Sequence, residues 1–289
     1  MTTSTLLITN PGSRLGESSL DELGARFRDQ GKVVERRPER AQDLPDLIRR
    51  HGPEVDRVVL GGGDGTVNLA LDALLEVERP LGLLPLGTAN DLARSLEIPQ
   101  ELEKAVAVIL SGNLRKVDVA FANEVSFINA IGMGLGPQMT REMDSETKSN
   151  WGMLAYMIGM ARAFREPRHF NATIRVDGRE ETYDCVQITV ANGIHYGGGM
   201  TIVDDAKLDD GQLDVLIVRK QSRLSLLGSI DRMRSGHTRA ADNMWHFRCS
   251  ELSITTDPVI EVTFDGEFLG RTPLHCTVRR HALRIYAPD

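Results

Sequence analysis

Hydrophobic and polar residues follow two alternating periods in the first part of the chain. Short apolar runs such as "TLLIT" and "RVVLGG" are each followed by a stretch with helical period. The pattern predicts strands within residues 4–9, 32–37, 55–63 and 79–87, and helices at 18–30, 43–51, 66–77 and 88–96. Because strands that alternate with helices usually form a parallel sheet, residues 1–122 are predicted to be an α/β domain.

Beyond residue 122 the pattern changes to longer segments with a period of two. These segments predict strands at 170–178, 182–193, 211–220, 250–256, 259–266 and 282–288. Asp177-Gly178 and Asp265-Gly266 predict hairpin turns. Two helical patches, near 150–165 and 223–235, interrupt the strands. Residues 123–289 are therefore predicted to form a mostly antiparallel domain, either a β-sandwich or a curled sheet.

Composition narrows the functional classes. With 289 residues and 41% hydrophobic content the chain can bury a sizeable core. A net charge of -7 argues against nucleic-acid binding and gives no attraction to an anionic membrane surface. The three cysteines form no C-x-x-C pair, no apolar run is long enough to span a bilayer, and no secretion signal is recognised. We expect a cytoplasmic protein.

The stretch "GGGDGTVN", residues 61–68, carries the first chemical signal. It does not fit the dinucleotide fingerprint G-x-G-x-x-G, because Thr66 and Asn68 stand where the third glycine would be, and it lacks the lysine of a Walker A loop. An ordinary turn needs fewer glycines than this. A phosphate cradle of another design fits better, with bare backbone N–H groups and a helix beginning near Thr66. Asp64 then suggests a metal-bound nucleotide or a ribose hydroxyl.

Further motifs follow in a specific order. They are "NPGS" (10–13), "LPLGTANDLAR" (84–94), "ANGIHYGGGM" (191–200), "AKLDDGQLDVLIV" (206–218) and "FDGE" (264–267). Together with the glycine stretch they resemble the diacylglycerol kinase catalytic domain family, in particular the bacterial soluble lipid kinases of the YegS and DgkB type. The resemblance covers the whole chain. It implies a nucleotide-binding domain like that of NAD kinases and phosphofructokinases, then a β-rich domain, with residues 279–289 returning to the first.

The resemblance also implies an ATP site. Its residues are Asn10, Gly62, Gly63, Asp64, Gly65, Thr66, Val67, Asn68, Thr88 and Asp91. Asn90 and Asp91 have a second interpretation, since "GTAND" is also a good capping sequence for the helix that follows. Both interpretations stay open.

Catalytic and metal-binding roles are implied for the second half. Glu267 matches the family's general base, although "DGE" can also be a plain hairpin turn. Asp210 matches a Mg²⁺ ligand, with the backbone carbonyls of Lys207 and Gln212 beside it, and a plain Asp-Gly turn is again the alternative. Asp118, interpreted as a strand-end acid, matches a residue that reaches the metal through water.

The chain departs from the family at three places. Leu69 stands where the family usually has Glu. The region around Pro38, "ERRPERAQ", lacks a threonine that commonly contacts nucleotide. Asp204 or Asp205 replaces a proline before the metal turn.

We therefore predict a kinase that uses ATP and Mg²⁺ to phosphorylate a membrane-lipid hydroxyl. The sequence does not distinguish diacylglycerol, phosphatidylglycerol and sphingoid bases. The expected partner is the lipid, with peripheral contact at the inner face of the membrane; a homodimer stays open. The stretch 151–164, "WGMLAYMIGMARAF", fits a core helix, the wall of a lipid cleft or a membrane-contacting surface. The alternatives are an NAD kinase, in which "DGE" has no role, and a non-catalytic nucleotide-binding regulator.

Overall fold

The chain divides into two compact units. The computed structural model describes residues 2–9, 17–135, 169–220, 243–265 and 267–289. The first unit comprises Met1–Asp118 and Arg280–Asp289, and the second comprises Val119–Arg279. The sequence had suggested a boundary after residue 122.

A parallel sheet forms the centre of the first unit. Its strand order is β2 (Val33–Arg36), β1 (Thr5–Thr9), β3 (Arg57–Gly62), β4 (Leu81–Pro85) and β17 (Leu274–Tyr286). Thr9 pairs with Gly61, and Gly62 pairs with Pro85, so β1, β3 and β4 end at the same edge of the sheet. The predicted α/β class of this half is confirmed.

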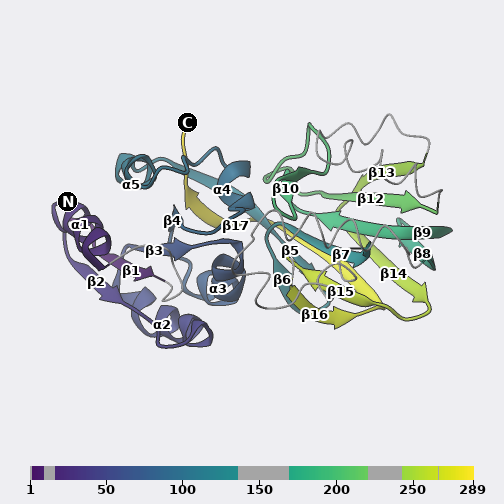
Figure 1. Cartoon of the computed structure of the whole chain (residues 1–289), viewed down its shortest axis with the longest axis horizontal. Helices are drawn as coiled ribbons and strands as arrows, with labels where there is room; N and C mark the ends of the chain where they lie inside the picture. Colours follow the sequence, from purple (N-terminus) through teal and green to yellow (C-terminus); the bar gives the residue numbers. More distant parts are fainter. Residues whose placement is uncertain (1, 10–16, 136–168, 221–242, 266) are drawn as a thin grey trace. The chain divides into compact units, whose positions relative to one another are not determined.

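Helices cover this sheet on both sides. They are α1 (Glu17–Arg28), α2 (Leu44–His51), α3 (Asp64–Val77), α4 (Asp91–Ser95) and α5 (Leu102–Ser111), with single 3-10 turns η1 (Ala41–Asp43) and η2 (Gly52–Glu54). Figure 1 shows α2 and α3 packed together on one side and α5 against β4 on the other. Helix α3 buries Val67, Ala70, Leu71 and Leu74, the spacing of one helical face. In the described part of the chain, no helix combines the length and apolarity that a membrane crossing requires.

The helices of the first unit differ from the sequence prediction at several points. Helix α3 begins at Asp64, two residues earlier than expected, so its first turn starts inside the glycine stretch. Helix α5 had not been predicted, although "LEKAVAVILS" buries Ala105, Val106 and Ile109.

The end of the chain joins the first unit's sheet. Ile285 of β17, yellow in Figure 1, pairs in parallel with Leu81 of β4. The buried Arg57 supports this junction: its Nε donates to Thr5 Oγ1 at 2.8 Å, and its guanidinium lies 5.9 Å from the ring centroid of Tyr286. Burial lowers the pKa of Arg57, which Tyr286 and Asp56 partly oppose.

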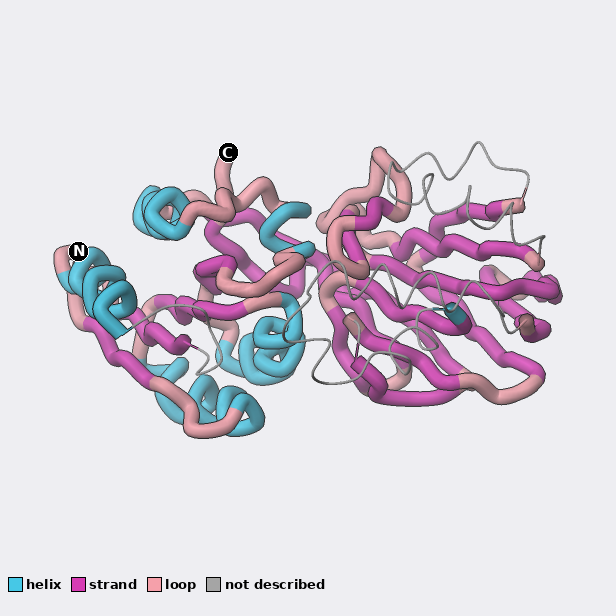
Figure 2. Tube along the Cα trace, viewed as in Figure 1, coloured by secondary structure: helices cyan, strands magenta, loops and turns pink. Residues whose placement is uncertain are grey.

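Strands are the dominant regular elements of the second unit where it is described, as Figure 2 shows. Its strands are the second part of β5 (Leu114–Ala122), then β6 (Val125–Phe127), β7 (Ala130–Gly134), β8 (Phe170–Val176), β9 (Arg179–Ala191), β10 (His195–Tyr196), β11 (Met200–Thr201), β12 (Leu213–Arg219), β13 (Met244–Cys249), β14 (Glu251–Asp257), β15 (Glu261–Phe264), β16 (Glu267–Arg271) and the first part of β17. Antiparallel pairing joins β12 to β13 and β9, β14 to β17 and β8, β15 to β16 and β7, β5 to β6, and β9 to β7 and β8. The helical patches expected at 150–165 and 223–235 lie outside the described residues.

Two hydrophobic clusters lie on opposite faces of the sheet around β12. Val215 and Ile217 belong to one cluster, and Leu216 and Val218 belong to the other. The strand is therefore buried on both faces, which explains its continuous apolar run and corrects the expectation of an alternating, half-buried strand. Asp177 and Gly178 both have positive φ, at 50° and 76°, and form the predicted turn between β8 and β9.

The three cysteines are part of the core. Cys185, Cys249 and Cys276 are buried and unpaired, and burial raises the pKa of each thiol to about 12. They are inert thiols with a packing role.

The aromatic pair beneath the β15–β16 turn generates a stability prediction. Phe264 is 1% exposed and packs edge-on against Phe127, with ring centroids 6.2 Å apart. We expect Phe264→Ala to lower the free energy of unfolding by about 3–5 kcal/mol, because it leaves a cavity in a closed core. Urea unfolding checks this, with Val259→Ala as control because Val259 is 62% exposed. A loss below about 1 kcal/mol for Phe264→Ala would contradict the described packing.

Candidate functional site

The glycine stretch lies where β3 ends and α3 begins, directly against the loop that follows β4. A Cβ atom added at Gly63 would lie 2.9 Å from Gly87 Cα, and one added at Gly87 would lie 2.5 Å from Gly63 Cα. Gly63 has φ -102°, a value open to any residue. These two glycines are therefore required by the close approach of two loops, and not by backbone conformation.

The Asp64 carboxylate joins the same two loops. Its Oδ2 accepts a hydrogen bond from the backbone N–H of Asp91 at 3.0 Å, and its Oδ1 accepts one from the N–H of Leu92 at 3.0 Å. Asp64 thus caps the start of α4 from a position 27 residues earlier in the chain. This contact gives Asp64 a structural role that the sequence argument had not considered.

Asn90 stabilises the second loop from within. Its Oδ1 accepts from the Gly87 N–H at 2.9 Å, and its Nδ2 donates to the Gly87 carbonyl at 3.0 Å. Asn90 occupies the N-cap position of α4, with φ 51°, but its side chain makes no capping bond. The capping interpretation of Asn90 is therefore wrong, because Asp64 supplies that bond.

The other residues of the predicted ATP site differ in exposure. Thr66 and Val67 are buried in the first turn of α3, and Gly65 and Thr88 are exposed. Asn68 Oδ1 is buried and has no hydrogen-bond partner among the described residues. An orphaned acceptor of this kind is matched by a ligand with N–H or O–H donors. Asn10 lies outside the described residues.

The "FDGE" turn connects β15 to β16 in the second unit. The Asp265 carboxylate accepts from the N–H of Ala130 at 2.8 Å and of Ile128 at 3.4 Å, and the Asp265 N–H donates to the Ala130 carbonyl at 2.9 Å. Asp265 therefore fixes this turn to the start of β7. Glu267 is the first residue of β16 and pairs with Phe264.

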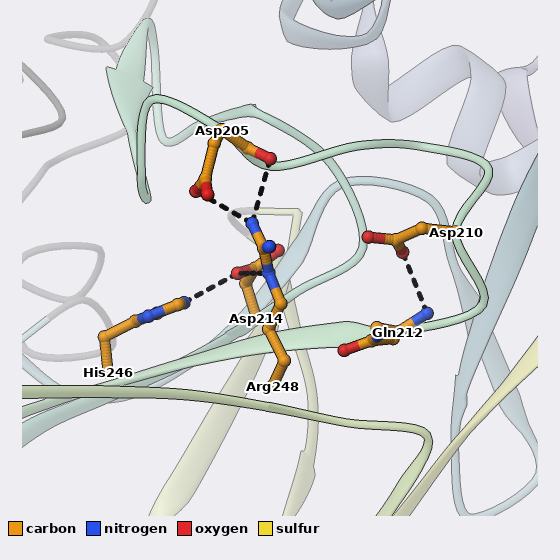
Figure 3. Close-up of polar contacts among 6 residues, drawn as sticks. All are labelled: Asp205, Asp210, Gln212, Asp214, His246 and Arg248. Carbon is orange, nitrogen blue, oxygen red and sulfur yellow. Dashed lines mark hydrogen bonds and ion pairs between the residues drawn. The ribbon is translucent and has the colours of Figure 1, made fainter.

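Asp210 lies in the turn before β12, drawn in Figure 3. Its Oδ1 accepts from the Gln212 N–H at 3.0 Å across Gly211, whose φ is 74°. No group of three or more His, Cys, Asp or Glu side chains suited to a metal occurs among the described residues. A cation at this turn would therefore be held by the Asp210 carboxylate and main-chain carbonyls, a donor set that suits a hard cation.

Asp118 is buried in the middle of β5, not at a strand end as the sequence had suggested. Its Oδ1 accepts from the backbone N–H of His281 at 2.7 Å. His281 has φ 53°, and it lies next to the point where β17 passes from the second unit to the first. Asp118 therefore stabilises the returning strand within the first unit.

Sequence reasoning missed a cluster of charges beside the Asp210 turn. Asp214 Oδ1 lies 2.8 Å from Arg248 Nε and 2.6 Å from His246 Nε2, and Arg248 also reaches Asp205 (Figure 3). Burial alone would lower the pKa of Arg248, but Asp214, Asp205 and Asp210 outweigh it and the pKa is raised. Only the pairing of β12 with β13, which places Arg248 opposite Asp214, reveals this cluster.

The bridging role of Asp64 predicts a stability effect. We expect Asp64→Ala to lower the free energy of unfolding by about 1–3 kcal/mol, because two N–H groups of α4 lose their charged acceptor. Urea unfolding measures this, with Glu22→Ala on the exposed side of α1 as the control. Equal stability of the two variants would show that the bridge contributes nothing.

Comparison with known proteins matches both units. Residues 4–122 match the diacylglycerol kinase catalytic domain, and residues 129–287 match the YegS C-terminal NAD kinase beta sandwich-like domain. The predicted sandwich is thereby confirmed.

Individual proteins that are similar to this chain point to the same family. A Staphylococcus haemolyticus (strain JCSC1435) protein named "Putative lipid kinase" is 30% identical over 82% of this chain and 78% of its own length. An uncharacterized Synechocystis protein is 29% identical over 90% of this chain, which spans only 60% of that relative. A crystal structure described as a "putative diacylglycerol kinase" from Bacillus anthracis str. Sterne superposes with a TM-score of 0.87 at 26% identity, covering 99% of this chain and 98% of that one. The chain therefore belongs to the lipid kinase family that joins a diacylglycerol kinase catalytic domain to a YegS-type β-sandwich domain.

Proposed function

We propose that this protein transfers the γ-phosphate of ATP to a hydroxyl group of a membrane lipid. The observation that carries the proposal is the pair of loops at the carboxyl ends of β3 and β4, held together at Gly63, Gly87 and Asp64. In α/β sheets, ligands bind at this edge. Membership of the lipid kinase family supplies the reaction class.

Phosphate recognition would rely on the backbone of the first loop. The N-terminus of α3, a helix of 14 residues, directs the positive end of its dipole toward the loop. Thr66 adds a hydroxyl in that first turn. The buried Asn68 Oδ1 would accept from a ribose hydroxyl or the adenine amino group, which gives the orphaned acceptor a partner.

Mg²⁺ is the expected companion of the nucleotide. Bound with ATP, it would neutralise charge on the phosphates during transfer. In the second unit, Asp210 with the carbonyls of Lys207 and Gln212 is the proposed set of protein ligands. The bond from the Gln212 N–H to Asp210 Oδ1 fixes the orientation of that carboxylate, so little ordering would be needed on binding.

Glu267 is the proposed general base. The lipid hydroxyl loses its proton to the Glu267 carboxylate as its oxygen bonds to the γ-phosphorus, and the bond to the β,γ-bridging oxygen breaks to release ADP. Asp265 would set the position of this residue, because its carboxylate fixes the turn to the backbone of β7. Aligning the two reactants is the larger part of the proposed catalysis.

The proposed acceptors are diacylglycerol, phosphatidylglycerol and sphingoid bases, each of which has a free hydroxyl. A protein that reaches such lipids would work in the cytoplasm at the inner face of the membrane. The stretch 151–164, one candidate for lipid contact, lies outside the described residues.

The proposal is tested by incubating the protein with a total-lipid extract, Mg²⁺ and γ-labelled ATP. We expect label in a chloroform-soluble phospholipid, loss of that label with EDTA, and no phosphorylation when NAD replaces lipid. Label in NAD but not in lipid would overturn the proposed substrate class. The absence of any labelled product would overturn the kinase activity.

The role of Glu267 gives the sharpest mutational prediction. Glu267→Gln should lower turnover by roughly 10²–10⁴-fold, because the amide keeps the size of the side chain but cannot accept the proton. ATP affinity measured by titration calorimetry should stay within about twofold of the parent, a free-energy change well below 1 kcal/mol.

Glu261→Gln on the neighbouring β15 is the matched control and should leave turnover near the parent's. Near-normal turnover of Glu267→Gln would place the base elsewhere. Loss of ATP binding would instead make Glu267 a ligand of the nucleotide or metal.

A further inference from the structure

The segment that carries Asp210, residues 202–212, is held by buried apolar side chains and by a charged contact with Arg248. Its apolar side chains Ile202, Val203, Ala206 and Leu208 are buried, so its base is part of the second unit's core. Its polar residues alternate with these: Asp204, Asp205, Lys207 and Asp209 are exposed. The segment 202–212 is thus a surface arch on a rigid base, with Asp210 near one end.

Arg248 is the charged group that connects this arch to the sheet. One amino group of its guanidinium lies 2.9 Å from both the carbonyl oxygen and the Oδ1 of Asp205. Its Nε donates to Asp214 Oδ1 at 2.8 Å. One planar guanidinium group therefore binds a backbone carbonyl of the arch and a buried carboxylate of β12 at the same time.

The anchoring carboxylate is itself fixed. Asp214 is 2% exposed and pairs directly across the sheet with Arg248. Its Oδ1 is also 2.6 Å from His246 Nε2. Burial and two hydrogen bonds to Oδ1 together limit the movement of this carboxylate, so Asp214 orients Arg248 from a fixed point.

We propose that Arg248 is a positioning residue for phosphoryl transfer: it fixes the arch 202–212 and thereby places the Asp210 carboxylate and its neighbouring carbonyls for Mg²⁺. This inference rests on the proposed function. In this role Arg248 binds neither metal nor substrate itself. It acts through Asp205 at one end of the arch and Asp214 at the start of β12, the two points between which the Asp210 turn is held.

The requirement is for the geometry of arginine and not only for its charge. A lysine keeps the positive charge but has a single nitrogen, which cannot bind Asp214 and both acceptors of Asp205 with the same spacing. Arg248→Lys should therefore keep the buried Asp214 compensated and the protein folded, while releasing the arch. Removing the charge altogether is a less informative change, because it leaves a buried carboxylate unpaired.

Hydrogen exchange followed by mass spectrometry tests the first step. In Arg248→Lys we expect backbone amides of residues 204–210 to exchange at least about 10-fold faster, because a local opening becomes easier, with exchange in β8 and β9 unchanged. Asp205→Ala, which leaves the Arg248–Asp214 pair intact, should show a smaller change of the same kind. The control is Arg175→Lys, since Arg175 pairs with Glu180 on an exposed hairpin of the same unit.

Kinetics test the second step. For Arg248→Lys, the Mg²⁺ concentration that gives half-maximal lipid phosphorylation should rise by about 10–100-fold, as expected when a supporting contact of a metal site is lost. The KM for lipid should stay within a factor of about two, because Arg248 positions the metal turn and not the acceptor. A purely stabilising residue would lower active protein without moving the Mg²⁺ dependence.

The outcomes separate this inference from the proposed function. Parent-like exchange at 204–210 in both Arg248→Lys and Asp205→Ala would show that Arg248 does not fix the arch, whether or not the parent is a kinase. Faster exchange with an unchanged Mg²⁺ requirement overturns the positioning role. If the parent itself transfers no phosphate, the proposed function fails, and with it the positioning role of Arg248 in phosphoryl transfer.

Discussion

The candidate nucleotide site depends on the contact between two loops of the first unit. Gly63 and Gly87 approach so closely that neither can carry a side chain, and the Asp64 carboxylate spans the same gap to reach the start of α4. β3 and β4 are neighbouring parallel strands, so their ends meet at one edge, and this contact decides the shape of that edge. The glycine-rich stretch 61–68 is thus explained in part by packing, because the two loops could not approach this closely with a side chain at Gly63 or Gly87.

Three of the acids that the sequence marked as functional, and Asp265 of the predicted β15–β16 turn, are held by the main chain. Asp64, Asp118, Asp210 and Asp265 each accept at least one hydrogen bond from a backbone N–H. Such bonds fix the position of a carboxylate without neutralising it. In a kinase that works mainly by alignment, this preorganisation is as important as the charge itself. A structural contact and a catalytic role are therefore compatible for these residues.

The fold was predictable from the sequence because its periodicities are strong and local. Both halves were identified, the first from its alternating strands and helices up to residue 96 and the second from its Asp-Gly turns. Two features were missed: the helix "LEKAVAVILS" and the burial of β12 on both faces. The site was predictable only where its residues are contiguous in the sequence, as in the glycine stretch. The bond from Asp64 to α4 and the Asp214–Arg248–His246 cluster join residues that lie 27 to 34 positions apart, and only the folded pairing brings them together.

The central claim, that the contact between these two loops creates the nucleotide site, is tested most directly by titration calorimetry of Mg-ATP with the parent and Gly87→Ala. A methyl group at residue 87 must push the loops apart at the backbone, so we predict that affinity falls at least about 100-fold, or about 2.7 kcal/mol, while circular dichroism shows a folded protein. Equal Mg-ATP affinity of the folded variant and the parent, or a parent that does not bind Mg-ATP, would contradict the account.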